Sequence, residues 1–262
     1  MTATKEATIV AILNRKGGAG KTTTALCLAE RLGQIGKKAL LIDLDQQHNA
    51  TNQYGAAIED MPTVYDLMCD PGADVVDAIQ HCDAGDIIAG DDLMNQIEAD
   101  TAALVGREYM LVEALEKVSE GYDFIVIDCP TSLGIIATNA LLAADKVVVP
   151  ALCGDAYSVD GFEKLLLFVE RIRSSKRLNP DLEVSGALIT QYEPRPLGSD
   201  ARAAELAEAC QRAGTRLYDT RIRRCCKVRD AQEACRSLFD FAPTCTSAQD
   251  YAAWVDEFLD VA

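Results

Sequence analysis

Residues 14–24 read NRKGGAGKTTT and lie between an apolar, β-branched run at 8–13 and a segment of helical periodicity at 21–34. A glycine-rich turn between a buried strand and a helix is the context of a phosphate-binding loop, whose usual pattern is G-x-x-x-x-G-K-[ST]. The stretch departs from that pattern twice. Arg15 occupies the place of the first glycine, and an additional lysine, Lys16, precedes the expected Lys21.

The glycines of this loop predict how it binds an anion. Gly17, Gly18 and Gly20 let backbone N–H groups converge on phosphate oxygens without obstruction by side chains, and the start of the helix adds favourable dipole charge. Lys21 is expected to reach the β- and γ-phosphates, and the Thr22 hydroxyl to ligate magnesium. A glycine-rich turn with chance lysines is the weaker interpretation, because G-K-T-T opens a helix directly after a buried strand.

Two further stretches place acids at the ends of predicted strands. LLIDLDQQHNAT, at 40–51, contains Asp43 and Asp45, and YDFIVIDCPTSLG, at 122–134, contains Asp128. An aspartate at the carboxyl end of a parallel strand beside a phosphate loop can hold magnesium through water, and Asp128 fits that role best. Asp45 follows its strand in a loop where it could face the γ-phosphate and orient the attacking water. The alternative for each acid is a solvated capping residue.

Strand-like and helix-like segments alternate along the chain. Several strands are apolar on both faces, which is typical of a parallel sheet covered by helices on both sides. The pattern predicts one domain over 1–262, of α/β class, with a doubly wound, mostly parallel sheet in a three-layer P-loop arrangement. Strands are expected at 8–13, 38–43, 85–89, 123–128, 145–150 and 183–190, and helices at 21–34, 63–81, 107–119, 134–143, 158–173, 199–213 and 247–260.

The motifs together resemble a known family. RKGGAGKTTTALCLAERL, LLIDLDQQHNAT and YDFIVIDCPTSLG occur in this order and are similar to the ParA/Soj-type partitioning ATPases of the deviant Walker A (ParA/MinD) superfamily, over roughly 8–235. The resemblance implies magnesium-dependent hydrolysis of ATP to ADP and phosphate by a homodimer with ATP sandwiched at its interface. It also implies a role for Lys16, which in such proteins crosses the interface to the partner's phosphates.

Matching the family's motifs residue by residue gives a predicted site. Asp45 matches the acid that orients water and Asp128 the Walker B acid, while adenine contacts are expected near 190–192 and 221–224. Where many relatives have D-P-Q-G-N-A-T, residues 45–51 read DQQHNAT, which puts the loop geometry and the hydrolysis rate in question. Thr131 likewise replaces the second proline of a D-x-P-P-S pattern. The phosphate loop comprises Lys16, Gly17, Gly18, Ala19, Gly20, Lys21, Thr22 and Thr23.

The charge of the chain bears on its partners. The formal net charge is −16, which argues against a protein coated all round in nucleic acid but not against a local basic patch. The resemblance implies non-specific DNA binding by the ATP-bound dimer. Residues 221–236 hold six basic and two acidic side chains, so the DNA contact is predicted there. The basic residues at 171–177 are more simply explained by the preference of cations for a helix C-terminus. The predicted DNA contacts are Arg221, Arg223, Arg224, Lys227 and Arg229.

The resemblance also implies a biological setting. A partitioning ATPase would act with a ParB-like centromere-binding partner, in the cytoplasm and associated with the nucleoid. No apolar run approaches the roughly 20 residues that span a bilayer, and the acidic helix at 247–260 is expected to pack on the core rather than on a membrane. Two alternatives stay open: a ParA-like switch that positions a protein cargo, and a slowly hydrolysing, nucleotide-gated scaffold.

The ten cysteines give little guidance to function. They include no C-x-x-C pair, and neither histidine lies at a zinc-ligand spacing from a cysteine. We expect reduced, mostly buried thiols. An iron–sulfur cluster shared between two subunits is the less favoured alternative.

Overall fold

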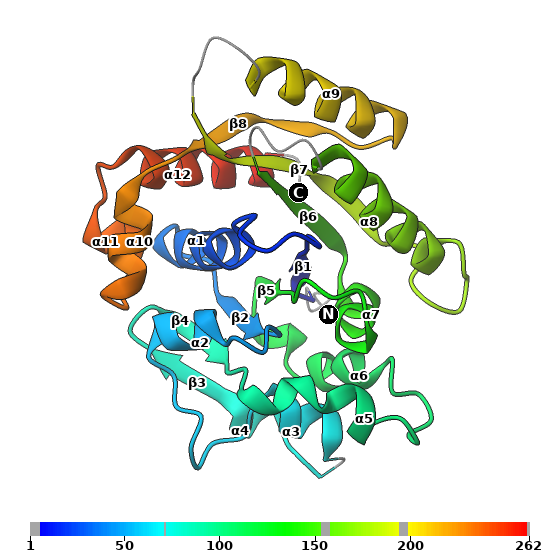
Figure 1. Ribbon diagram of the computed structural model, residues 1–262. Coiled ribbons are helices and arrows are strands. Elements are labelled where there is room, and N and C mark those ends of the chain that lie inside the picture. The colour runs from blue at the N-terminus through cyan, green and yellow to red at the C-terminus, as the bar shows by residue number, and fades with distance from the viewer. Residues whose placement is uncertain (1–5, 71, 153–157, 194–198, 261–262) are drawn as a thin grey trace, which may run out of the picture.

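The computed structural model describes residues 6–70, 72–152, 158–193 and 199–260, and its eight described strands form a single sheet (Figure 1). The strand order is β3-β4-β2-β5-β1-β6-β7-β8, and every neighbouring pair is parallel except β3 and β4. The predicted mostly parallel, doubly wound sheet is therefore confirmed. The strands are β1 Thr8–Ile12, β2 Ala39–Asp43, β3 Ile79–Cys82, β4 Gly85–Ile88, β5 Phe124–Asp128, β6 Lys146–Leu152, β7 Glu183–Tyr192 and β8 Leu217–Arg223.

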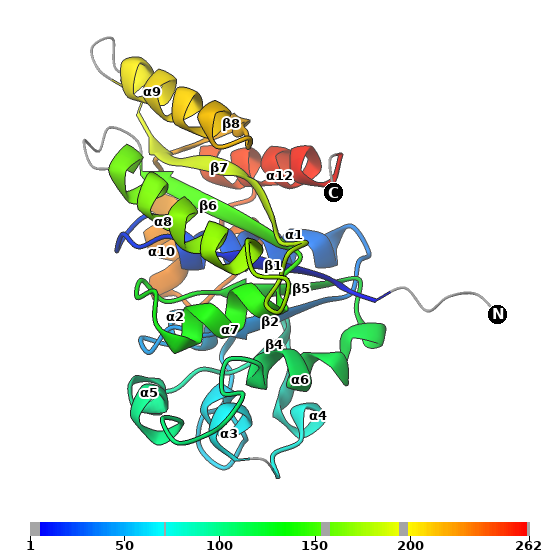
Figure 2. The same cartoon turned by 90° about the vertical axis from the view of Figure 1, so that its right-hand side faces the viewer.

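Helices cover both faces of this sheet and confirm the three-layer arrangement. One apolar core lies between the sheet and α1, α2, α11 and α12, and the other between the sheet and α3 to α9, the layer that faces the viewer in Figure 2. The helices are α1 Lys21–Gln34, α2 Asn49–Tyr54, α3 Val64–Cys69, α4 Val75–Ala78, α5 Ile97–Asp100, α6 Met110–Glu116, α7 Ile135–Ala143, α8 Ser158–Arg173, α9 Ser199–Arg212, α10 Cys226–Glu233, α11 Leu238–Phe241 and α12 Thr246–Leu259, with 3₁₀ turns η1 Asp92–Asn95 and η2 Ser119–Gly121.

The central strands are buried on both sides, which is why their sequences are continuously apolar rather than alternating. All five residues of β5 are buried, and β5 lies between β1 and β2. The register pairs Asp43 at the end of β2 with Asp128 at the end of β5. Because the strands are parallel, the two acids and the loop after β1 all lie at the same edge of the sheet.

The last helix packs on the core, as predicted. Tyr251, Trp254, Val255 and Phe258 of α12 are all buried. Trp254 meets the ring of Tyr218 on β8 edge-on, with centroids 5.8 Å apart and an interplanar angle of 88°. This contact fixes α12 against the edge strand and closes one end of the sandwich.

One expectation about secondary structure is wrong, and several elements were not predicted. The single helix predicted at 63–81 is instead α3, α4 and the short strand β3, because the C-D-P-G-A-D sequence at 69–74 interrupts the helix and Asp74 caps a new one through the Val76 N–H. β8, α2, α5, α10 and α11 were not predicted as elements. β8 reads LYDTRIR with only two buried residues, so its sequence lacks the apolar run on which strand prediction depends.

The cysteines are more exposed than expected. None of the nine described cysteines forms a disulfide among the described residues, and only Cys27, Cys129 and Cys210 are buried. The expectation of mostly buried thiols is therefore wrong. The tenth, Cys153, lies outside the described residues. Within the described part of the chain, no helix combines the length and apolarity needed to cross a membrane.

A buried acid on α1 makes stability depend on pH. Glu30 is 6 % exposed and accepts a hydrogen bond of 2.7 Å from the Ser237 hydroxyl. Burial raises the pKa of Glu30 from 4.5 to about 7, while the Ser237 hydrogen bond partly offsets the rise. A raised carboxyl pKa means that the native state holds the proton more tightly, so this group's favourable contribution is lost as pH rises from 4.5 through 7.

We predict that Glu30→Gln stabilises the protein at pH 8 and has little effect at pH 5. The amide keeps an acceptor for Ser237 and removes a buried charge whose cost is up to about 3 kcal/mol. Thermal unfolding at the two pH values measures the difference, with an expected rise in Tm of several degrees at pH 8 only. Glu113→Gln, at an exposed position on α6, is the control. Equal effects of Glu30→Gln at both pH values would contradict the argument.

Candidate functional site

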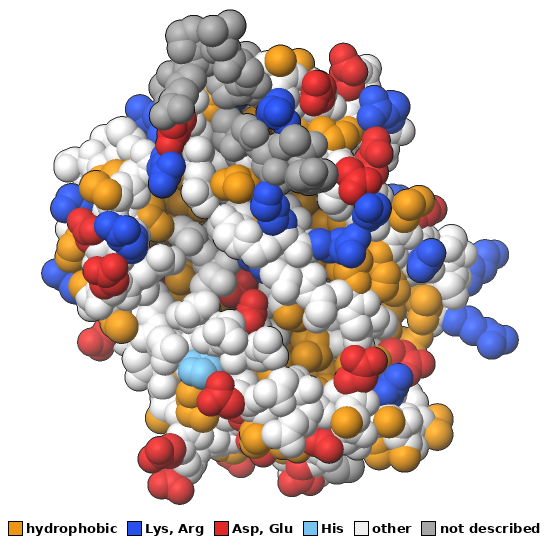
Figure 3. All heavy atoms as spheres, viewed as in Figure 1, with side chains coloured by type: hydrophobic (Ala, Val, Ile, Leu, Met, Phe, Trp, Pro, Cys, Tyr) orange, Lys and Arg blue, Asp and Glu red, His pale blue; other side chains and the backbone are white. Residues whose placement is uncertain are grey.

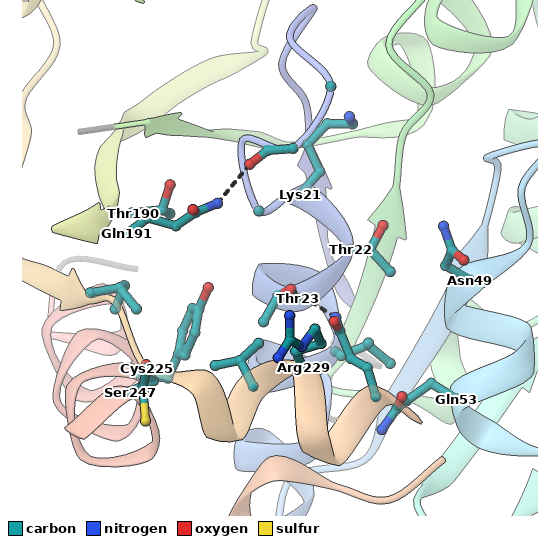
Figure 4. Close-up of a pocket in the computed structure, with 18 of the residues that line it drawn as sticks. Lys21, Thr22, Thr23, Asn49, Gln53, Thr190, Gln191, Cys225, Arg229 and Ser247 are labelled. Atoms are coloured by element: carbon teal, nitrogen blue, oxygen red, sulfur yellow. Dashed lines mark hydrogen bonds between the residues drawn. The ribbon is translucent and has the colours of Figure 1, made fainter. Parts of the chain in front are cut away.

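A cavity of about 900 Å³ opens at the carboxyl edge of the sheet (Figure 4). Six segments line it: the loop after β1 with the start of α1, the loop after β2 with α2, the loop after β5, the end of β7, the stretch from β8 through α10, and α12. The lining residues used below are Gly17, Gly18, Gly20, Lys21, Thr22, Thr23, Asp45, Gln47, Asn49, Gln53, Thr131, Thr190, Gln191, Ile222, Arg223, Arg224, Cys225, Val228, Arg229, Gln232 and Tyr251. The cavity thus combines segments that are more than 200 residues apart in sequence.

The glycines predicted to cradle a phosphate have the required backbone. Gly18 and Gly20 have φ values of 72° and 86°, in the left-handed region that favours glycine. At Gly17 and Gly18 a Cβ would meet no atom within 4 Å, so open space lies beside the loop. Gly20 caps α1 without a side-chain hydrogen bond, and the first turn of α1 has no acidic residue. Its N–H groups therefore remain available for an anion.

The two lysines of the loop lie in different environments. Lys21 is 6 % exposed and lines the cavity. Lys16 is exposed and does not belong to the cavity lining. Its backbone N–H donates to the Asn14 side chain, whose own amide donates to the Pro150 carbonyl on β6. Asn14 therefore holds the loop at the point where it leaves the sheet, and Lys16 projects from that point.

Asp128 lies close to Thr22 and Lys21, but it is not one of the residues that line the cavity. It is fully buried at the end of β5, and neither carboxylate oxygen has a hydrogen-bond partner among the described residues. Burial raises its pKa well above the ordinary value and neighbouring Asp43 adds to the rise, whereas the Thr22 hydroxyl and the Lys21 charge lower it. A buried, unpartnered carboxylate beside a threonine hydroxyl suits a hard cation held partly through water.

The donor set supports magnesium rather than a softer metal. The described residues contain no group of three or more histidine, cysteine, aspartate or glutamate side chains positioned to hold an ion. Mg²⁺ fits this arrangement, because it is usually bound by one or two protein oxygens together with waters and phosphate oxygens. Thr22 and Asp128 are the residues that could supply those protein oxygens.

Asp43 has a structural role that the sequence did not reveal. Its carboxylate accepts hydrogen bonds of 2.9 Å from both the N–H and the hydroxyl of Thr51, on α2, and one of 3.2 Å from the Asp45 N–H. The Thr51 hydroxyl in turn accepts from the Gly90 N–H. A Cβ at Gly90 would lie 2.6 Å from the Asp43 carbonyl oxygen, so only glycine allows this approach. Asp43 therefore fixes the loop that carries Asp45.

The loop that departs from the family pattern keeps a glycine-like backbone. His48 has φ 37° and ψ 40° and caps α2 in the left-handed conformation, which costs a non-glycine residue about 1–2 kcal/mol. The Gln47 N–H donates to the Asp45 carboxylate at 3.0 Å, and the His48 N–H to the Asp45 carbonyl at 2.8 Å. Asp45 is half-buried and lines the cavity. His48 thus adopts the left-handed conformation that glycine would adopt without strain.

The predicted basic cluster divides between the cavity and the outer surface. Arg223, Arg224 and Arg229 line the cavity. Arg223 forms a two-pronged ion pair with Asp250, with distances of 2.6 and 2.8 Å, and Arg224 pairs with Glu193 at 2.8 Å. Lys227 pairs with Asp230 and Arg229 with Glu233, while the Arg221 guanidinium lies 5.0 Å from the centroid of the Tyr192 ring. The cluster therefore carries less uncompensated charge than its sequence suggests.

Three contacts at the site were missed by sequence analysis. The Gln232 amide on α10 donates to the Thr23 hydroxyl at 3.1 Å. Thr190 and Gln191, at the end of β7, donate to carbonyls of the phosphate loop. The sequence had pointed to 190–192 only as a neighbourhood for adenine. No local pattern marks these residues, because each contact joins segments at least 170 positions apart.

Several known proteins are similar to this chain over most of its length. Residues 7–184 match the family described as "AAA domain". Soj, the sporulation initiation inhibitor protein of Bacillus subtilis, is 36 % identical over 93 % of this chain and 94 % of its own length. The chromosome partitioning protein ParA of Caulobacter vibrioides is 34 % identical over 96 % of this chain and 93 % of its own length.

The chain belongs to the ParA/Soj-type family of P-loop ATPases. Among solved structures, cobyrinic acid a,c-diamide synthase from Mycobacterium smegmatis, with bound ADP and magnesium, is similar with a TM-score of 0.80 and 27 % identity. The match covers 97 % of this chain and 94 % of that one. The ParA/Soj resemblance predicted from the three motifs is confirmed, and the protein is an ATPase.

For this ParA/Soj-type ATPase we predict that His48→Gly is tolerated and His48→Val is not. Glycine adopts the observed backbone without strain, whereas a β-branched residue at positive φ forces the loop to rearrange and moves Asp45. Steady-state phosphate release, measured beside the ATP affinity, should show normal binding in both variants but a clearly lower kcat for valine. If the valine variant hydrolyses ATP as fast as the glycine variant, the backbone at position 48 does not control Asp45.

Proposed function

We propose that the protein is an ATP-dependent dimerising ATPase that binds DNA without sequence preference and partitions plasmid or chromosomal DNA with a ParB-like partner. Family membership supports ATP hydrolysis, and the name of the relative from Caulobacter vibrioides, a chromosome partitioning protein, supports a partitioning role. The dimer proposal rests on the contrast between two lysines of the loop: Lys21 is buried and lines the cavity, whereas Lys16 is exposed and does not line it. In this proposal Lys21 serves the chain's own nucleotide, and Lys16, on the exposed surface, serves the nucleotide of a second subunit.

Within one subunit, each proposed role follows from position. The N–H groups of 17–23 and the start of α1 bind the phosphate oxygens, and Lys21 neutralises charge on the β- and γ-phosphates. Thr22 and Asp128 hold Mg²⁺, which when bound neutralises charge that develops on the phosphoryl oxygens. Asp45 orients the attacking water, and its own orientation is fixed by the Gln47 N–H.

Lys16 acts across the dimer interface in this proposal. The transition state of phosphoryl transfer carries most of its charge on oxygen, and a cation supplied by a second subunit stabilises it. Each subunit would place Lys16 against the partner's phosphates, so ATP binding and dimerisation favour one another. Hydrolysis removes the γ-phosphate and weakens that link. The nucleotide thereby becomes a switch for the assembly.

The adenine ring has a defined place in this proposal. Ile222, Cys225, Val228 and the buried Tyr251 supply an apolar wall at the end of the cavity away from Asp45. A planar base is bound well by such a surface with a few polar groups at its edge. The guanidinium groups of Arg223 and Arg224 are held there by Asp250 and Glu193.

DNA binding is compatible with the acidity of the chain because the charges are segregated. Residues 39–106 contain 14 of the 41 acids and no lysine or arginine. This stretch includes β3, at one edge of the sheet, whereas the basic cluster begins on β8, at the other. Seven strand spacings of about 4.8 Å separate the edges by about 34 Å, and charges are screened beyond about 8 Å at physiological salt. Figure 3 shows acidic side chains along the lower margin of the face that it presents.

The proposed DNA surface comprises Arg221, Arg223, Arg224, Lys227 and Arg229, and the structure ranks them for testing. Since Arg223, Arg224 and Arg229 also line the nucleotide cavity, reversing their charge would disturb both functions. Arg221 and Lys227 do not line the cavity, so substitutions at these two residues test DNA binding separately from nucleotide binding. A dimer presents this surface twice, so ATP raises DNA affinity through avidity.

The setting of this proposed activity follows from the partitioning role. The chain would act as one domain over 1–262, in the cytoplasm and on the nucleoid, with the ParB-like protein recruiting it to a centromere. One observation favours a second candidate, a slowly hydrolysing scaffold gated by nucleotide: the strained His48 in the loop that orients Asp45. A turnover rate that neither DNA nor a ParB-like partner stimulates would support the scaffold.

We predict that Lys16→Ala binds ATP as a monomer but does not dimerise, and that its turnover falls at least about tenfold, because its target is the partner's nucleotide. Analytical ultracentrifugation with ATP, together with phosphate release, measures both. Asp45→Ala is the matched comparison, since it should form the ATP dimer and fail to hydrolyse. Lys21→Ala, which should lose tight ATP binding, checks the phosphate loop itself. Normal dimers and turnover in the Lys16 variant would remove the role in trans.

We also predict that the ATP-bound protein shifts random-sequence duplex DNA at low salt, and that the ADP-bound protein does so far less. Because phosphate contacts release counterions, the shift should weaken steeply as salt rises. Arg221→Glu with Lys227→Glu should abolish it while ATP binding and dimerisation persist. The same reversal at Arg171 and Arg173, exposed on α8, is the control for net charge. A wild-type ATP dimer that ignores DNA even at low salt would refute the partitioning proposal.

A further inference from the structure

The end of β7 contacts the phosphate loop on the side away from Asp45 and Asp128. The Thr190 hydroxyl donates to the Ala19 carbonyl at 2.8 Å, with the Ala151 carbonyl farther off at 3.3 Å. The Gln191 side-chain amide donates to the Gly18 carbonyl at 2.8 Å, the contact drawn in Figure 4. Two consecutive residues of one strand thus hold two consecutive carbonyls of the loop.

The planarity of the peptide bond turns these contacts into a statement about phosphate binding. In a trans peptide the carbonyl of one residue and the N–H of the next point in opposite directions. Holding the Gly18 carbonyl toward β7 therefore directs the Ala19 N–H away from β7, and holding the Ala19 carbonyl does the same for the Gly20 N–H. The two N–H groups are directed toward the open side of the loop, where the phosphate is proposed to bind.

Backbone strain and packing indicate that this arrangement is maintained at a cost. Gln191 has φ 51°, in the left-handed region, where a non-glycine residue is disfavoured. Such strain persists where surrounding contacts hold it, and it concentrates at functional sites. Thr190 is only 1 % exposed, and its methyl group would lie 3.5 Å from a Cβ at Gly20. The end of β7 is therefore packed against the loop at its most restricted glycine.

We propose that Thr190 and Gln191 are positioning residues, which hold the Gly18 and Ala19 carbonyls so that the following N–H groups are oriented for the phosphates before nucleotide arrives. This inference rests on the proposal that the loop binds phosphate. Its effect is preorganisation, because donors that are already aimed need no rearrangement upon binding. The residues act through the loop backbone and touch neither the metal ligands nor the attacking water.

The test replaces each donor by a group of similar shape. Thr190→Val removes the hydroxyl at nearly constant shape, whereas Thr190→Ser keeps the hydroxyl. Gln191→Met removes the amide at nearly constant length. We expect Thr190→Val and Gln191→Met each to weaken MgADP and MgATP binding about tenfold, as loss of one hydrogen bond at a bound anion does, and Thr190→Ser to bind like the wild type. KM should rise more than kcat falls, because the water-orienting acid is untouched.

Two controls separate positioning from other roles. Ser185 is on β7, the strand that also carries Thr190 and Gln191, and its hydroxyl forms a buried hydrogen bond of 2.8 Å with the Tyr218 hydroxyl on β8. Ser185→Ala should therefore lower Tm without changing nucleotide affinity. Lys21→Ala tests the phosphate loop itself: if that variant binds ADP normally, the proposed phosphate site fails, irrespective of β7. Gln191 is exposed, so its methionine variant should fold even if Thr190→Val does not.

The ratio of ATP to GTP affinity distinguishes the remaining possibility, in which Gln191 contacts the base. Positioning lowers both affinities together and leaves the ratio unchanged. A changed ratio in Gln191→Met would overturn the inference in favour of base recognition. Wild-type affinity for MgADP in both Thr190→Val and Gln191→Met, or failure of Thr190→Ser to restore binding, would overturn it as well.

Discussion

The structure depends on one constraint: the N–H groups at the start of α1 must be satisfied by something other than the chain. Gly20 provides no capping side chain, and the first turn contains no acid. Every nearby element serves that arrangement. β1 delivers the loop from the centre of the sheet, Asn14 holds its first bend against β6, and the end of β7 holds its carbonyls from the other side. An anion is the partner that such a helix start favours.

The two acids at the ends of β2 and β5 favour a cation beside the phosphate loop. Asp43 and Asp128 are paired in register on adjacent strands, and both are fully buried. Asp43 is satisfied by Thr51, but the carboxylate of Asp128 has no hydrogen-bond partner in the described part of the chain, and burial raises its pKa strongly. Leaving a carboxylate in this state is costly, so binding a cation here should stabilise the native fold as well as the nucleotide.

The sequence predicted those features that depend on neighbouring residues in the chain. Residues 14–24, Asp45 and Asp128 were located because each follows a run of apolar residues whose spacing identifies a strand, and parallel strands bring their carboxyl ends together. β8 was missed because LYDTRIR has no apolar run and the strand is only partly buried at the edge of the sheet. The contacts of Thr190 and Gln191 join residues 171 and 173 positions apart, so only the fold reveals them.

The same reasoning changes the meaning of the basic cluster. In the sequence, the cluster is a local excess of positive charge. In the structure, only some of its residues on β8 and α10 line the cavity. Arg223 and Arg224 face the nucleotide cavity and are held by Asp250 and Glu193, whereas Arg221 and Lys227 lie outside the cavity lining. A nucleotide that reorganised the inner ion pairs would move the outer cations with them, since both belong to the same strand and helix. Because Arg223, Arg224 and Arg229 of the proposed DNA surface also line the cavity, a nucleotide bound there would have a direct physical means of changing DNA affinity in addition to avidity, if the proposed DNA surface is correct.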